Sequence, residues 1–229
     1  MVEFQGVSKV YARRTGGRVP VLTDASFRVA PGEMVVLTGP TGAGKSTVFR
    51  LVAGEERPNQ GTVLVDGEDV GALGPRGVAR LRRRLGLIPQ EPRLLSDRTV
   101  FGNVALVLRA LGASRSEARA RALAALRDAG LAAKPNALPW ELAAGERQRL
   151  VIARALAGAP ELVLADEPTT ALEGAAAHEI VGLLQAMHAR GATVLVATQT
   201  ASLAAELDAR TLRLDGGRVR ADGSPRGTP

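Results

Sequence analysis

The chain has 229 residues, a formal net charge of +7 and no cysteine, so it can bury a sizeable core but forms no disulfide and carries out no thiol chemistry. Basic chains are attracted to nucleic acid or to anionic lipid surfaces, but an aromatic content of 3% leaves little for base stacking and disfavours single-stranded nucleic acid. The first residues are not typical of a signal peptide and no run of about 18 apolar residues occurs, so we expect no membrane span.

A small antiparallel lobe is predicted at the N-terminus. Residues 2–10 and 24–29 alternate between polar and apolar side chains, and a turn at residues 31–33 follows. Tyr11, the only tyrosine, follows the first predicted strand. It either stacks on an adenine base or is a half-buried strand tyrosine, and its spacing alone does not decide between these interpretations.

A phosphate-binding motif comes next and organises the chain. Its residues fit G-x-x-x-x-G-K-[ST], with an apolar run at residues 34–37 before it and a helix-compatible run at 48–53 after it. Glycines let backbone N–H groups converge on a phosphate, and a helix N-terminus adds about half a positive charge. Lys45 would reach the β- and γ-phosphates, and the Ser46 hydroxyl would ligate Mg²⁺. We therefore predict an NTP-binding site, rather than a simple strand-to-helix turn, at Gly39, Pro40, Thr41, Gly42, Ala43, Gly44, Lys45, Ser46 and Thr47.

The middle of the chain changes from strands to helices. A strand is predicted at residues 61–67, and an arginine-rich helix at 78–85 presents either a solvated face or a patch for lipid headgroups or a partner. Residues 85–90 predict a short buried strand that ends in Gln90. Strand signals are nearly absent from 91 to 159, so this stretch predicts an α-helical lobe inserted into an α/β core.

Two adjacent carboxylates end the next predicted strand. The apolar run at residues 162–165 leads directly to Asp166 and Glu167. In a chain with a phosphate-binding loop, such an aspartate holds Mg²⁺, and the following glutamate can polarise the attacking water. Beyond them we predict a helix, a strand, a hairpin and a loose tail, at residues 175–190, 192–197, 211–219 and 221–229.

Residues 142–150, between these two motifs, resemble the signature of ATP-binding-cassette (ABC) ATPases, usually L-S-G-G-E-Q-Q-R. Leu142, Gly145, Glu146, Gln148 and Arg149 match it, and Ala143, Ala144 and Arg147 differ. The resemblance covers residues 2–219. It implies an α/β P-loop NTPase (RecA-like) core with an N-terminal antiparallel β lobe and an inserted α-helical lobe. The implied domain is a single ABC nucleotide-binding domain over 1–220, with core segments 1–90 and 160–220, an insert at 91–159 and a tail at 221–229.

The family resemblance also implies roles for particular residues. Tyr11 would stack on adenine, and Gln90 would sense the metal and the attacking water. In this family two cassettes pair head to tail, so Ala143, Gly145 and Glu146 of one copy would cap the phosphate held by the other. Residues 170–173 would form the loop that crosses between the copies.

The sequence departs from the family pattern at two of these positions. Gln199 stands where the family has a histidine, and the only histidines, His178 and His188, lie on the preceding predicted helix. Gln199 can still donate an N–H to the γ-phosphate but is neutral, and Ala143 lacks the usual hydroxyl donor. Losing one positioned donor costs about 2.7–4 kcal/mol of transition-state stabilisation, so we expect slow hydrolysis and better preserved binding.

Within the family, residues 32–34, 56–58, 83–86 and 94–105 resemble the FtsE-type cell-division cassettes. This implies a homodimer at the cytoplasmic face of the cell membrane, coupled to an integral membrane partner of FtsX type through Gln90 and residues 94–100, with no nucleic acid bound. Two alternatives stay open, namely an ATP-gated binding module with little hydrolysis and the cassette of a lipoprotein or macrolide exporter. A DNA-repair cassette is least favoured, because the insert is too short for a coiled coil.

Overall fold

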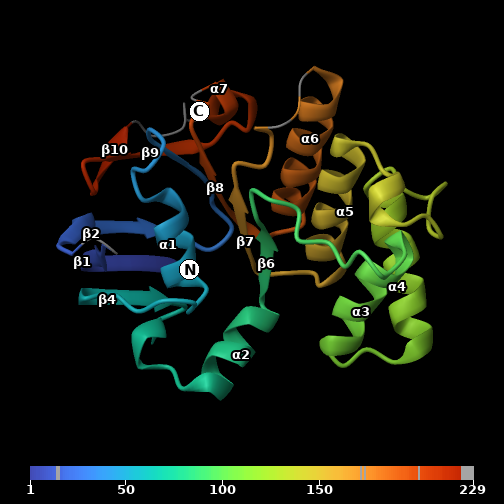
Figure 1. Ribbon diagram of the computed structural model, residues 1–229, viewed down its shortest axis with the longest axis horizontal. Helices are drawn as coiled ribbons and strands as arrows, with labels where there is room; N and C mark the ends of the chain where they lie inside the picture. The colour runs from blue at the N-terminus through green and yellow to red at the C-terminus, as the bar shows by residue number, and fades with distance from the viewer. Residues whose placement is uncertain (14–15, 171, 173, 201, 223–229) are drawn as a thin grey trace. The chain divides into compact units, whose positions relative to one another are not determined.

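The protein is described by a computed structural model that covers residues 1–13, 16–170, 172, 174–200 and 202–222 (Figure 1). These residues fall into two compact units. The first comprises residues 1–82 together with the chain from Thr193 onward, and the second comprises residues 83–192. Each unit carries part of the predicted nucleotide machinery.

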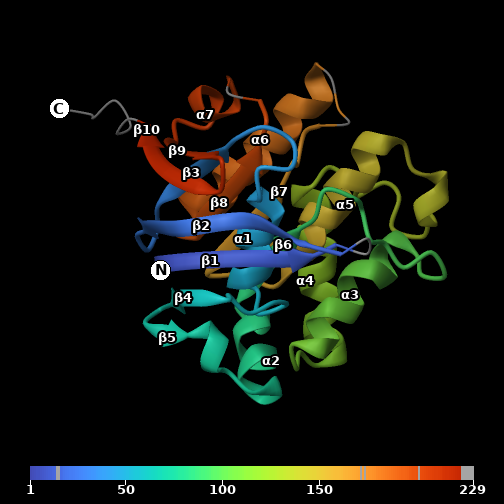
Figure 2. The same cartoon turned by 60° about the vertical axis from the view of Figure 1, so that its left-hand side comes forward.

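The N-terminal sheet of the first unit is antiparallel, as predicted. Its strand order is β2-β1-β4-β5, which Figure 2 shows side by side. Phe4 on β1 stacks on Phe27 of β2 with ring centroids 4.5 Å apart. At the start of β1, Val2 and Phe4 are buried whereas Glu3 and Gln5 are not, because one face of the sheet is covered. The strands are β1 (Val2–Ala12), β2 (Arg18–Val29), β4 (Gln60–Val65) and β5 (Glu68–Asp69).

A second group of strands in the first unit carries the phosphate-binding loop. β3 pairs in parallel with β8 and with β9, and β10 closes an antiparallel hairpin with β9. β8 is buried throughout and β3 nearly so, as strands covered on both faces must be. The elements are β3 (Met34–Thr38), β8 (Thr193–Thr198), β9 (Arg210–Asp215) and β10 (Arg218–Asp222), with helices α1 (Lys45–Val52), α2 (Pro75–Arg83) and α7 (Ser202–Glu206) and the 3₁₀ turn η1 (Val70–Ala72).

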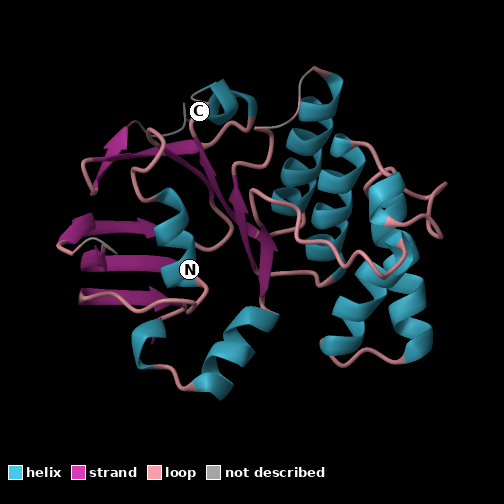
Figure 3. Ribbon diagram, viewed as in Figure 1, coloured by secondary structure: helices cyan, strands magenta, loops and turns pink. Residues whose placement is uncertain are grey.

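The second unit is mainly helical (Figure 3). Residues 91–159, all of them described, contain helices and loops only, as predicted. Their core includes Val104, Leu108, Leu126 and Leu150, which are each fully buried. Two parallel strands, β6 (Leu85–Ile88) and β7 (Leu162–Asp166), pair within this unit. Its helices are α3 (Val100–Ala110), α4 (Arg115–Asp128), η2 (Pro139–Glu141), α5 (Ala144–Ala157) and α6 (Ala175–Ala189).

Several predicted boundaries are shifted. The arginine-rich helix begins at Pro75 rather than at residue 78, because Pro is well suited to the first turn of a helix. β10 runs through residue 222, so the predicted tail begins two residues too early. Residues 223–229 lie outside the described residues. None of the described helices is both long and apolar enough to cross a bilayer.

Candidate nucleotide site

The loop between β3 and α1 depends on its glycines for packing as well as for phosphate binding. A Cβ atom at Gly39 would lie 2.4 Å from the carbonyl oxygen of Leu214 on β9. Gly44 has φ 107°, and a Cβ there would lie 2.8 Å from Cγ1 of Val21. Neither position can accept a side chain without movement of its neighbours. The shape of the loop is therefore fixed by contacts inside the first unit.

Lys45 is folded over this loop. Its side chain is buried, and its Nζ donates hydrogen bonds to the carbonyl oxygens of Gly39 at 2.7 Å and of Pro40 at 3.3 Å. Ser46, the next residue of α1, is exposed, and the first turn of the helix contains no acidic residue. The positive end of the helix dipole is therefore not opposed by a carboxylate of its own first turn.

The structure brings Gln199 to the same loop. Gln199 follows β8, which pairs with β3, and the Thr41 hydroxyl donates a 2.8 Å hydrogen bond to its Oε1. Gln199 is exposed, whereas Thr198 before it is buried. The residue at the family's histidine position therefore contacts the phosphate-binding loop, and its role toward the γ-phosphate stays a prediction.

Tyr11 lies near the third residue of α1. Its hydroxyl donates a 2.6 Å hydrogen bond to Glu56 and lies 3.3 Å from Oγ1 of Thr47. Burial and the hydrogen bond to Glu56 raise the pKa of the Tyr11 hydroxyl. The sequence motifs indicate no role for Glu56 at the site, although the residue belongs to the stretch that resembles FtsE-type cassettes. Its contacts could not be read from the sequence, because they join segments 45 residues apart.

The second unit places two predicted residues at one sheet edge. β6 and β7 are parallel neighbours, and Ile88 pairs with Ala165. Gln90 and Asp166 follow these paired residues, so they lie at the carboxyl edge of the strand pair, where ligands bind in open α/β sheets. Gln90 is exposed and Asp166 is half-buried.

Glu167 is held in an unusual backbone conformation. It has φ 46°, in the left-handed region that non-glycine residues seldom adopt, and it is only 5% exposed. The Thr170 hydroxyl donates a 2.8 Å hydrogen bond to its Oε2. Strained conformations of this kind concentrate at functional sites. Of the predicted crossing loop, Ala171 and Glu173 lie outside the described residues.

The signature-like residues form the start of α5. Ala143 is the N-cap residue of α5. Its side chain has no hydrogen-bond acceptor, so no side-chain cap forms at the start of this helix. Glu146 compensates in part, because its Oε2 accepts a 3.0 Å hydrogen bond from the Ala143 amide while its Oε1 pairs with Lys134 at 2.6 Å. The Lys134 contact holds the pKa of Glu146 below its usual range. Gly145 packs beside Ala176 of α6. The predicted contacts of Ala143, Gly145 and Glu146 with a phosphate in a second copy stay predictions.

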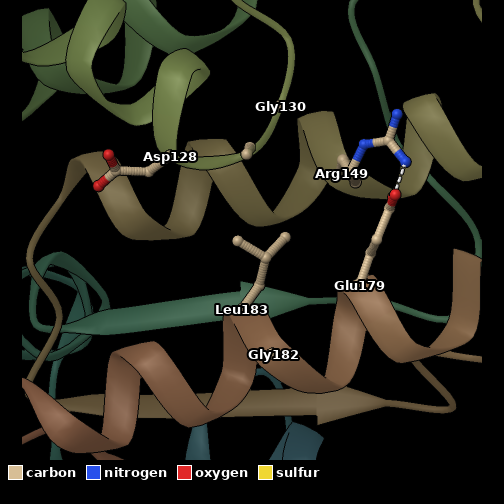
Figure 4. Close-up of a pocket in the computed structure, with 7 residues that line it drawn as sticks. Asp128, Gly130, Arg149, Glu179, Gly182 and Leu183 are labelled. Carbon is tan, nitrogen blue, oxygen red and sulfur yellow. Dashed lines mark hydrogen bonds and ion pairs between the residues drawn. The ribbon is translucent and has the colours of Figure 1, made fainter. Parts of the chain in front are cut away.

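The second unit also contains a pocket of about 320 Å³ between α4, α5 and α6 (Figure 4). Arg149 and Glu179 form an ion pair at one end of it, and Asp128 lies at the other. None of the residues predicted to contact nucleotide lines this pocket. The pocket therefore lies apart from the predicted nucleotide site.

The oxygen ligands available suit magnesium. The Ser46 hydroxyl at the start of α1 and the Asp166 carboxylate at the end of β7 are hard donors, which Mg²⁺ prefers. Mg²⁺ is usually held by one or two protein groups together with substrate phosphates and water. No cluster of three or more His, Cys, Asp or Glu residues that could hold a metal ion occurs among the described residues. His178 and His188 both lie on α6, as predicted.

A phosphate-binding loop, a strand ending in paired carboxylates and a helix that begins at a signature-like sequence together define the class of ATP-binding cassettes. Residues 22–170 match the model of the ABC transporter family, and the chain belongs to that family. The comparisons confirm the predicted fold class and the predicted enzyme class, an ATPase.

Two kinds of curated relative are similar to the chain. The cell division ATP-binding protein FtsE of Escherichia coli K12 is 43% identical over 219 residues, which cover 96% of this chain and 97% of FtsE. The methionine import ATP-binding protein MetN of Caulobacter vibrioides is 41% identical over 225 residues, which cover 98% of this chain and 67% of MetN. Similarity to methionine importers was not anticipated from the motifs.

A solved structure matches the whole chain. It is a dimeric ATP-binding cassette in a post-hydrolysis state bound to ADP and Pi, with a TM-score of 0.91, 32% identity and 100% coverage of both chains. A second dimeric structure, of a bacterial ABC transporter cassette, gives the same TM-score and identity.

Proposed function

We propose that the chain is the ATP-hydrolysing subunit of a membrane complex, in which two copies close head to tail on ATP and pass this closure to an integral membrane partner of FtsX type in cell division. The chain would work at the inner face of the cell membrane, bound through that partner. The observation that carries the nucleotide part is Lys45, buried and folded over the loop at the start of α1. The 43% identity to FtsE supports the division role.

The first unit would hold the triphosphate of ATP. Loop amides and the α1 N-terminus would bind the phosphate oxygens, and Lys45 Nζ would exchange the carbonyl oxygens of Gly39 and Pro40 for the β- and γ-phosphates. Ser46, Gln90 and Asp166 would hold Mg²⁺, which neutralises charge that develops on the phosphates. Gln199, held by Thr41, would donate its amide N–H to the γ-phosphate.

The second unit would supply the general base, Glu167. It would also supply the N-terminus of α5, which would cap the phosphate held by the other copy. Glu167 would accept a hydrogen bond from the attacking water and orient it, while the Thr170 hydroxyl fixes the rotamer of its carboxylate. The N-terminus of α5 would close over the phosphate held by the second copy. With a neutral Gln199 and no hydroxyl at Ala143, two donors differ from the family pattern, so turnover is expected to be slow.

Steady-state hydrolysis by the purified chain tests the enzyme part, with Lys45→Ala as the variant that cannot bind the phosphates and Glu167→Gln as the variant that binds but does not hydrolyse. We expect Glu167→Gln to accumulate as an ATP-bound dimer in light scattering. ATP binding by Lys45→Ala at the wild-type affinity would contradict the site. Co-purification from membranes tests the partner: an FtsX-type protein supports the division role, whereas an importer or exporter permease contradicts it.

An ATP-gated binding module is the second candidate, and the unfilled cap at Ala143 favours it. Such a module dimerises on ATP and holds its partner, so hydrolysis is incidental. Glu167→Gln separates the two functions in the cell. A motor loses function when it locks in the ATP-bound dimer, whereas a gate keeps it.

A further inference from the structure

In the first unit, the Glu56 carboxylate forms hydrogen bonds and ion pairs with both β1, which carries Tyr11, and α1, which follows the phosphate-binding loop. Glu56, in the turn after α1, has a side chain that is 22% exposed. Its Oε2 accepts the Tyr11 hydroxyl at 2.6 Å and lies 3.0 Å from Lys9 Nζ, and both of these residues are on β1. Its Oε1 lies 3.1 Å from Nε of Arg50 on α1. Both oxygens of the carboxylate are therefore bonded, one to the strand and one to the helix.

Further contacts join these residues into a group that also includes Thr47. We call this group the Glu56 cluster, and it consists of Lys9, Tyr11, Thr47, Arg50 and Glu56. Arg50 also donates to Oγ1 of Thr47 at 3.1 Å, and Thr47 is almost completely buried in the first turn of α1. The Lys9 ammonium lies 5.2 Å and the Arg50 guanidinium 5.8 Å from the centre of the Tyr11 ring. The ring is thus held through its hydroxyl and by two cations.

The geometry points to Glu56 as a positioning residue for the nucleotide base. In this proposal, which rests on the proposed ATP site, Glu56 fixes the Tyr11 ring of β1 relative to α1, the helix whose N-terminus holds the phosphates. The ligand is a purine nucleoside triphosphate, whose base must stack on Tyr11 while its phosphates occupy the loop. Preorganising the ring removes part of the entropic cost of binding. Glu56 touches no reacting atom, so it changes affinity and not the chemical step.

The charges in the cluster explain why a carboxylate is needed there. Lys9 and Arg50 place two cations next to one aromatic ring, and Glu56 is bonded to both. Without that anion the two cations repel each other and the Tyr11 hydroxyl loses its charged acceptor. The Tyr11 ring then samples other rotamers, and the base can stack only on the fraction of molecules with the correct rotamer, which lowers the apparent affinity for ATP.

The test compares a ligand that has a base with one that has none. ATP and inorganic tripolyphosphate are titrated into the wild type, Glu56→Gln, Tyr11→Phe and Tyr11→Ala, with Glu55→Gln as the matched control on an exposed neighbour. Complete loss of base stacking weakens binding roughly 5- to 150-fold, which sets the limit for Tyr11→Ala. We expect ATP to bind Glu56→Gln and Tyr11→Phe about fivefold more weakly, and tripolyphosphate to bind as in the wild type.

Two further readouts separate positioning from general damage. In steady-state hydrolysis, Glu56→Gln should raise KM and leave kcat at saturating ATP unchanged. The double variant Tyr11→Phe with Glu56→Gln should lose less affinity than the sum of the two single variants, because both act on one hydrogen bond, which Tyr11→Phe removes and Glu56→Gln leaves with a neutral acceptor. Wild-type ATP affinity in Glu56→Gln, an equal loss for tripolyphosphate, or additive losses in the double variant would each overturn the proposal. Because the main readout is binding, a wild type that binds ATP without turnover would overturn only the proposed hydrolysis.

Discussion

Replacing Ala143 by serine should raise both stability and turnover, for separate reasons. Three helices of the second unit begin with nearly the same N-cap backbone, at Thr99 (φ −62°, ψ 166°), Ser114 (−62°, 165°) and Ala143 (−63°, 162°). The hydroxyl of Thr99 accepts from the Gly102 amide at 3.0 Å, and that of Ser114 accepts from the Glu117 amide at 3.2 Å. Ala143 has no acceptor, so a serine there would enter a backbone already shaped for it.

The stability effect follows from capping energetics. A serine N-cap is worth about 1 kcal/mol over alanine, which in a chain of this length raises Tm by about 2–4 °C. The turnover effect is independent of it. A hydroxyl can accept the amide N–H of α5 and still donate its own hydrogen to a phosphate of the second copy. A restored donor is worth up to about 2.7–4 kcal/mol, so kcat should rise by up to about 10²–10³-fold.

Thermal unfolding and steady-state ATP hydrolysis measure the two effects. Ala120→Ser is the matched control, because it makes the same chemical change at an exposed interior position of α4, where serine is a slightly poorer helix former. If Ala143→Ser does not stabilise the fold, the capping argument is wrong. If it stabilises the fold and turnover stays at the wild-type rate, α5 does not present this residue to a phosphate.

Three further predictions follow from described residues. Gln199→His should raise kcat by about tenfold, because a charge-assisted hydrogen bond is about twice as strong as a neutral one. A wild type that already turns over as fast as this variant would contradict the expected slow hydrolysis. Trp140, the only tryptophan, is 64% exposed and lies three residues before Ala143. Its fluorescence emission should therefore shift to the blue when ATP closes the Glu167→Gln dimer. An unshifted spectrum in a dimer verified by light scattering would place the start of α5 outside the interface. Glu146 has a lowered folded-state pKa because of Lys134, so its contribution to stability is present above its unfolded pKa of about 4.5 and is lost as the pH falls through the folded value. Glu146→Gln should therefore flatten the loss of stability on the acid side of that window, and a curve that stays parallel to the wild type in acid denaturation would refute this assignment.

Local signals account for what the sequence predicted well. The phosphate-binding loop was recognisable because its glycines, Lys45 and Ser46 act within one strand–loop–helix unit. The position of Asp166 and Glu167 at the end of a strand was predicted because a buried apolar run leads directly to them. The helical stretch from 91 to 159 was predicted from composition and spacing. In each case a single run of sequence contains the whole signal.

What the sequence did not predict depends on pairings between distant segments. Glu56 accepts a hydrogen bond from Tyr11, which lies 45 residues earlier, and no periodicity in the sequence predicts that contact. The end of β10 is set by cross-strand pairing, because Ala221 pairs with Leu212 although the sequence around it is typical of a loose tail. The strained backbone at Glu167 likewise has no sequence signal, because a glutamate carries no preference for a left-handed conformation.

The close approach of Gly39 to Leu214 has a consequence for the order of events during synthesis. The phosphate-binding loop packs against Leu214 of β9, which follows Gly39 by 175 residues in the sequence. A ribosome-bound chain that has not yet extruded β9 carries the complete motif without that support. ATP capture should therefore begin only after β9 has left the ribosome and packed against the loop.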